Sequence, residues 1–216
     1  MRFLFVCALF FLGHLNSIAS NPPSPSDATI EEVQRAWDQI KSYQADFHQI
    51  IRSKTLGTQE ETQGTLSVLK PLKLRWECPL SGTLQILNGK ELWQIKKSKR
   101  RKRLQVEHYT DISQQIDLRT LTFLADQANI VNSYKYQVLS SSKDRLVLAL
   151  MPKTGGEETL LAEILKPGYL LGALKMESSG SETRITFKNI RTNIPLKDSW
   201  FKYQASPDDV VHEHKR

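Results

Sequence analysis

The residues best suited to chemistry are few in this chain of 216 residues, and they are scattered. Beyond the first twenty residues, histidine stands at positions 48, 108, 212 and 214, and no pair has the H-E-x-x-H spacing or a comparable metal-binding spacing. His212 and His214 flank Glu213 near the end of the chain, where we expect disorder rather than a metal site. The histidines therefore predict neither a metal centre nor a general base.

Cys78 is the one cysteine outside the N-terminal segment, so an internal disulfide is not expected. A lone cysteine without a local catalytic signature is usually a small buried apolar residue, and we interpret Cys78 in this way rather than as a nucleophile. Gly155-Gly156 lacks the following Lys-Ser/Thr of a phosphate-binding loop. The sequence thus predicts no enzyme, no metal and no cofactor.

A basic run, K-K-S-K-R-R-K-R, is the strongest charged feature of the chain. Three interpretations are open. It can be a solvated hairpin tip whose like charges oppose aggregation, a contact to anionic headgroups or an acidic partner, or a nucleic-acid site, which the lack of interleaved aromatic residues disfavours. The candidate residues for a partner or membrane contact are Lys96, Lys97, Lys99, Arg100, Arg101, Lys102 and Arg103.

The first twenty residues have the pattern of a secretory signal peptide. A basic start at Arg2 precedes the apolar run 3–12, and small residues follow at 17–20. The apolar run is short for a membrane anchor, which is the alternative interpretation, because a span needs about 20 residues. We therefore expect cleavage and a periplasmic protein. The formal net charge of +7 changes little on cleavage, since Arg2 is the one charge removed, and it favours anionic partners.

Apolar periodicity then divides the chain into helix and strands. Residues 21–28, rich in proline, predict an extended leader. Ile30, Val33, Trp37 and Ile40 have helical spacing, which predicts an amphipathic helix within 30–43, with Thr29 and Glu32 as its capping box.

Alternating apolar residues predict about ten strands after this helix. We place them, with a helical segment over 112–125 between the two groups, at 64–70, 73–78, 83–87, 91–96, 103–109, 136–139, 145–150, 160–165, 170–176 and 183–188. Successive hairpins at this spacing indicate an antiparallel up-and-down sheet that curls toward a barrel. We therefore predict a mainly β fold with helices.

A curled sheet of about ten strands encloses more space than its own side chains fill, so it holds a helix or a ligand. An ordinary hydrophobic core is the alternative. The apolar residues expected to share the concave face are Leu66, Val68, Leu74, Trp76, Leu84, Ile86, Trp93, Leu146, Leu148, Leu150, Ile185 and Phe187.

Several motifs, in order, resemble the LolA family of periplasmic lipoprotein carriers. They are S-Y-Q-A-D-F-H-Q (42–49), G-T-L-S-V-L-K-P-L-K-L-R-W-E (64–77), I-L-N-G-K-E-L-W (86–93), L-A-L-M-P-K (148–153) and F-K-Y-Q-A-S-P-D-D-V-V (201–211). Each motif is weak alone, but the ordered set spans nearly the whole secreted chain.

The resemblance implies a single domain over residues 29–216: an unclosed antiparallel β-barrel of about ten or eleven strands under a helical lid. It implies a monomer that carries acylated lipoproteins from an inner-membrane ABC-type transporter to an outer-membrane acceptor. In the family, an arginine of the R-P motif holds the lid closed. Lys70 stands at that position here, so an ammonium group, a point charge, replaces the planar guanidinium group. The expected lid and latch residues are Lys70, Trp37, Leu121 and Phe123.

Two alternatives remain open. A half-barrel without catalytic residues can dock an envelope partner through the basic run, or carry lipids other than lipoproteins.

Overall fold

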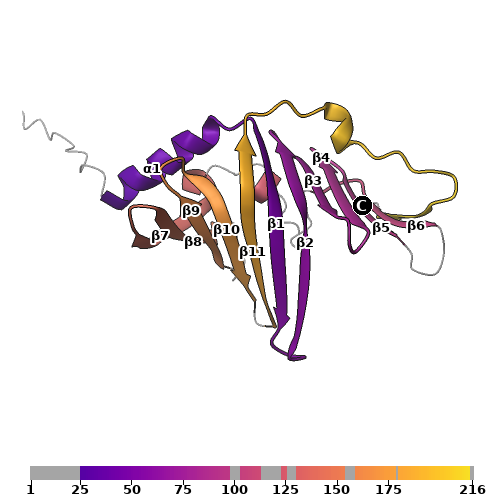
Figure 1. Cartoon of the computed structure of the whole chain (residues 1–216), viewed down its shortest axis with the longest axis horizontal. Coiled ribbons are helices and arrows are strands. Elements are labelled where there is room, and N and C mark those ends of the chain that lie inside the picture. Colours follow the sequence, from indigo (N-terminus) through magenta and orange to yellow (C-terminus); the bar gives the residue numbers. More distant parts are fainter. Residues whose placement is uncertain are drawn as a thin grey trace, which may run out of the picture.

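The computed structural model describes residues 25–97, 103–112, 123–125, 130–153, 159–178 and 180–214, with the backbone alone at 25–28. One twelve-stranded sheet dominates this part of the chain, as Figure 1 shows. Its strands are β1 (Ser42–Ser53), β2 (Thr58–Leu69), β3 (Lys73–Cys78), β4 (Thr83–Asn88), β5 (Leu92–Lys97), β6 (Leu104–Tyr109), β7 (Tyr134–Ser141), β8 (Arg145–Pro152), β9 (Thr159–Leu165), β10 (Leu170–Glu177), β11 (Ser181–Thr192) and β12 (Val210–His214).

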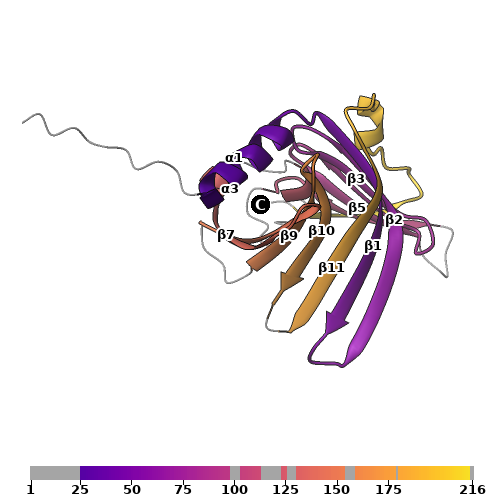
Figure 2. The ribbon, with the colours of Figure 1, turned by 60° about the vertical axis from the view of Figure 1, so that its left-hand side comes forward.

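The strand order is β12-β6-β5-β4-β3-β2-β1-β11-β10-β9-β8-β7. Each half of the chain forms an up-and-down meander, and antiparallel pairing of β1 with β11 joins the two meanders. β12 adds to β6 as a parallel strand. Because β7 and β12 are the two edges and do not pair with each other, the sheet curls without closing, as Figure 2 shows. The predicted unclosed antiparallel barrel is confirmed.

Strand alternation explains how this sheet gains an apolar face. In β3, K-L-R-W-E-C buries every second residue, and in β9 the same alternation buries Leu160, Ala162 and Ile164. Successive side chains of a strand point to opposite faces, so one face collects the apolar residues. That face is the hollow side of the curl, across which helix α1 (Pro25–Asp38) runs in Figure 2.

Helix α1 begins and ends earlier than the sequence predicted. It starts at Pro25, so residues 25–28 are helical and are not part of an extended leader, and Thr29 with Glu32 lies inside the helix rather than at its cap. Proline is well tolerated in the first turn because its missing N–H has no helical partner there. At the other end, β1 takes Ser42 and Tyr43, which the predicted helix had included.

Two strands were not predicted, so the sheet has twelve rather than ten or eleven. β1 carries apolar residues at both faces in its second half, and β12 is short and mostly exposed. The expected disorder at His212 and His214 is therefore wrong: both lie in β12, where His214 contacts Glu107 and stacks on Tyr109.

The segment predicted to be helical over 112–125 is described only in part. Residues 123–125 are helical, while Leu121 lies outside the described residues. A short helix, α3 (Ile130–Ser133), follows and leads into β7. None of the helices in the described part of the chain is both long and apolar enough to cross a membrane.

Candidate functional site: the apolar concave face

The concave face is built from neighbouring residues of several strands. Tyr43 faces Val68 and Ala45 faces Leu66 across β1 and β2, and Phe47 packs on Trp76 with ring centroids 3.8 Å apart. Of the residues predicted for this face, the ones that share its buried cluster are Leu66, Val68, Leu74, Trp76, Leu146, Leu148, Leu150, Ile185 and Phe187.

Three predicted residues lie on the other face. The register pairs Leu74 with Leu87 and Trp76 with Gln85, so Leu84 and Ile86 of β4 point away from the concave side. Trp93 of β5 pairs with Ile86 of β4, so its side chain also points to the convex side. The prediction assumed that Leu84 and Ile86 point to the concave side. In a strand, a shift of one residue moves every side chain to the opposite face.

Sequence reasoning also missed residues that do line the concave side of β4 and β5. Leu87 and Leu92 face each other there and both belong to the buried cluster. Leu87 directly follows Ile86, so the two apolar neighbours gave no signal of which one points inward.

The convex side of β4 to β6 has an apolar core of its own, which the C-terminal segment covers. A 3-10 turn, η2 (Asp198–Phe201), follows β11 and brings the buried Phe201 toward β4. Trp93 stacks on His108 with centroids 3.5 Å apart, and Tyr203 lies 5.4 Å from Trp93. Trp93 therefore packs against the C-terminal segment, and Leu84 and Ile86 lie on the same convex face.

Helix α1 covers the concave face. Ile30, Val33 and Trp37 of its apolar stripe are fully buried, as are the strand residues beneath them. Phe123 packs edge-on against Trp37, with centroids 5.9 Å apart, and against Tyr134 at 5.8 Å. The predicted lid residues Trp37 and Phe123 thus lie together over the concave face.

Lys70 contacts the end of α1, where its Nζ donates a hydrogen bond of 2.6 Å to the carbonyl oxygen of Trp37. A cation is favourable there because the last carbonyls of a helix lack partners and carry partial negative charge. The structure therefore brings the predicted latch residue to the rim of the concave face, in contact with the covering helix.

Tyr169 is a second rim contact, which the sequence did not predict. Its carbonyl oxygen accepts a hydrogen bond from Trp37 Nε1 at 2.7 Å, and its hydroxyl donates to Glu32 at 2.6 Å. This hydroxyl donation to Glu32 raises the pKa of Tyr169. Tyr169 comes two residues after Lys166-Pro167, and Leu72 directly after Lys70-Pro71; both have a positive φ, and the two Lys-Pro turns were the available signal.

One buried polar group of the concave face, the hydroxyl of Tyr43, is held by the backbone. The hydroxyl of Tyr43 donates to the carbonyl oxygen of Leu171 at 2.9 Å, and burial raises the pKa of Tyr43. This tyrosine therefore stays neutral and hydrogen-bonded, as a buried polar group must.

The catalytic candidates do not assemble into a site. Cys78 is buried, and this burial raises the pKa of its thiol, the opposite of what a nucleophile requires. His48 lies 3.2 Å from Glu61 near a pocket of about 460 Å³ at the edge where β3 ends. Within the described residues, no three His, Cys, Asp or Glu side chains are grouped so as to hold a metal ion.

The basic run is described only at its ends. Lys96, Lys97 and Arg103 are exposed. Lys99, Arg100, Arg101 and Lys102 lie outside the described residues.

An unclosed antiparallel sheet, with an apolar concave face under a helix, defines a binding protein of the half-barrel class. Residues 38–204 match the family model described as outer membrane lipoprotein carrier protein LolA. Because the match covers more than half of the chain, this chain belongs to that family, whose members are binding proteins without catalytic activity.

Individual relatives are distant but cover at least nine tenths of the chain. An outer-membrane lipoprotein carrier protein of Methylococcus capsulatus is 23% identical over 99% of this chain and 98% of its own length. One from Coxiella burnetii is 24% identical over 94% of each chain. Among solved structures, an uncharacterized conserved protein from Thermus thermophilus matches with a TM-score of 0.52 at 11% identity, over 88% of this chain and all of that one. It shows the fold alone.

Proposed function

We propose that this protein is a periplasmic carrier that shields the acyl chains of lipoproteins on its concave face and moves them from the inner to the outer membrane. The relatives named as outer-membrane lipoprotein carrier proteins support the cargo and the compartment. The proposal includes cleavage after residue 20, a monomeric carrier, an inner-membrane ABC-type transporter as donor and an outer-membrane acceptor.

One observation carries the proposal: a helix covers the apolar face, and a few hydrogen bonds at the rim of that face hold the helix in place. Each buried methylene of an acyl chain contributes about 0.8 kcal/mol, so the chains cannot cross water unshielded. Leu66, Leu148 and Leu150 offer the apolar surface that replaces water. Lys70 and Tyr169 hold the cover near its C-terminal end.

Transfer also requires release, and the cover supplies it. When cargo leaves, Ile30, Val33 and Trp37 of α1 return to the apolar face and recover the buried area. The free energy of closing therefore opposes the free energy of acyl binding. A carrier balanced in this way binds its cargo reversibly and passes it on without a nucleotide of its own.

Native mass spectrometry tests the proposal. The protein is purified from its own envelope without detergent, and the bound mass is identified after denaturation. We expect one acylated lipoprotein per chain. Another lipid bound one to one would redirect the proposal to a different cargo. A protein that arrives empty and takes up no added lipoprotein would overturn the carrier function in favour of a module that docks an envelope partner.

A further inference from the structure

The turn between β3 and β4 presents a leucine to solvent. Leu80 is 83% exposed, in a turn closed by a hydrogen bond from the Gly82 N–H to the Pro79 carbonyl. Ser81 Oγ also donates to the Cys78 carbonyl at the base of the turn. Because these two hydrogen bonds hold the turn, Leu80 is presented by a turn of defined backbone conformation.

Exposed cations lie on the β5–β6 side of this turn, and Glu61 lines a pocket with Leu80 and Ser81. The Lys97 N–H donates to the Gly82 carbonyl at 3.0 Å, and Thr83 pairs with Lys96 across the ladder. Lys97 in turn faces Leu104, next to Arg103. Lys96, Lys97 and Arg103 are exposed, and none forms an ion pair with another residue that the structure describes.

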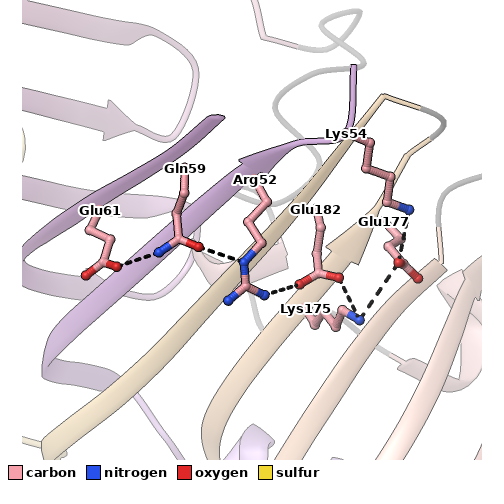
Figure 3. Close-up of polar contacts among 7 residues, drawn as sticks. All are labelled: Arg52, Lys54, Gln59, Glu61, Lys175, Glu177 and Glu182. Carbon is pink, nitrogen blue, oxygen red and sulfur yellow. Dashed lines mark hydrogen bonds and ion pairs between the residues drawn. The ribbon is translucent and has the colours of Figure 1, made fainter. Parts of the chain in front are cut away.

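The tip of the β1–β2 hairpin provides the contrast. Leu56 there is 76% exposed, but the charges near its base neutralise one another. Arg52 contacts Glu182 at 3.2 Å and Lys54 contacts Glu177 at 3.2 Å, and Figure 3 shows Lys175 reaching both glutamates. An exposed leucine with paired charges has no preference for an anionic surface, whereas Leu80 has unpaired cations beside it.

We propose that the Leu80 tip, formed by Pro79–Gly82 with Lys96, Lys97 and Arg103, docks the protein on an anionic phospholipid bilayer. Leu80 enters the headgroup boundary while the cations bind lipid phosphates, the combination found in reversible interfacial anchors. One apolar residue and a few cations give weak docking, which suits a protein that must leave the membrane again. The inference goes beyond the carrier function, because docking requires no bound cargo.

Vesicle flotation tests the docking. The secreted form (residues 21–216), stripped of lipid, is mixed with vesicles of phosphatidylglycerol and phosphatidylethanolamine or of phosphatidylcholine alone. We expect partition onto the anionic vesicles alone, weakening as salt is raised. Leu80→Ser should lower the partition coefficient about tenfold. The triple change of Lys96, Lys97 and Arg103 to Gln should lower it about a hundredfold, at about fivefold per charge.

Leu56→Ser is the matched control and should bind as the parent does. Partition that is equal for both lipid compositions, or an equal loss in Leu56→Ser and Leu80→Ser, would overturn the proposal. As a second readout, an environment-sensitive dye is attached to Leu80→Cys or Leu56→Cys, since the buried Cys78 stays unlabelled. Its emission should shift to the blue on anionic vesicles at position 80 and stay unchanged at position 56. Failure here leaves the carrier function standing, because cargo binding is measured separately.

Discussion

At the scale of single residues, we propose that Lys70 sets how firmly the concave face is closed. Its ammonium group donates a hydrogen bond to the last turn of α1. The sequence singled out this residue but did not show its partner, because Trp37 lies 33 residues away and the hydrogen bond exists only in the folded chain.

Replacing Lys70 tests this control. Lys70→Met removes the hydrogen bond to the Trp37 carbonyl, which costs the closed form about 1 kcal/mol. Acyl binding, which needs the open form, should then tighten about fivefold, by the arithmetic of linked equilibria. Titration with a triacylated lipopeptide measures the change. Lys70→Arg keeps a donor and should stay close to the parent. Weaker binding by a folded Lys70→Met protein would contradict a latch.

Asp198 has a role at the convex face that depends on pH. Hydrogen bonds from Lys73 and Lys202 lower the pKa of its carboxyl from 3.8 to about 2. A lowered carboxyl pKa stabilises the fold above pH 3.8, and this contribution is lost as pH falls through about 2.

Melting temperatures measured against pH check this assignment. Asp198→Asn should melt below the parent at neutral pH, and the gap should close as the pH is lowered from 3.8 to about 2. Asp208→Asn, an exposed neighbour on the same segment, is the control and should melt with the parent at every pH. A gap for Asp198→Asn that does not change with pH would show that the ion pairs are not its cause.

At the scale of elements, the C-terminal segment performs a structural task separate from the concave face. Phe201 is buried over β4, and Tyr203 packs near Trp93. Tyr203 also donates a hydrogen bond to Asp209 at 2.7 Å, and burial first, then Asp209, raises the pKa of Tyr203 to about 12. The segment thus seals the convex side of β4 to β6.

Phe201→Ala separates the two faces. It should lower the free energy of unfolding by about 3 kcal/mol, because a large buried ring leaves a cavity. Affinity for the triacylated lipopeptide should not change. Leu148→Ala is the comparison on the concave side: it should lower stability by a similar amount and alter acyl affinity as well. Urea denaturation and lipopeptide titration measure both variants. Loss of acyl binding in a folded Phe201→Ala protein would refute the separation.

Sequence alternation predicted strands such as β3 and β9 well, because each has one apolar face and one polar face. It could not orient β4, where Leu84, Ile86 and Leu87 are apolar together. A strand covered on both sides reads as nearly continuous apolar sequence, so its pattern cannot say which residues face inward. The covering segment 198–203 has three aromatic residues among six, and the sequence did not show which of them is buried: Phe201 is, whereas Trp200 is 43% exposed.

At the scale of the whole molecule, the curl of the sheet and the length of α1 determine what the protein can hold. The central pairing of β1 with β11 brings together strands from the two ends of the chain, a contact that no local pattern predicts. The family resemblance implied the unclosed barrel, which the structure confirms, but it did not supply this pairing. The concave face that results is covered by α1, whose Ile30, Val33 and Trp37 belong to its buried cluster.

The central claim is that acyl chains occupy the concave face, and two tryptophans on opposite faces test it. Trp76 lies on the concave face and Trp93 on the convex face. Single-tryptophan variants, with the other three of the four replaced by Phe, are titrated with a lipopeptide whose acyl chains carry bromine, a short-range quencher. The account predicts strong quenching of Trp76 and none of Trp93. Equal quenching of both, or quenching of Trp93 alone, would contradict it.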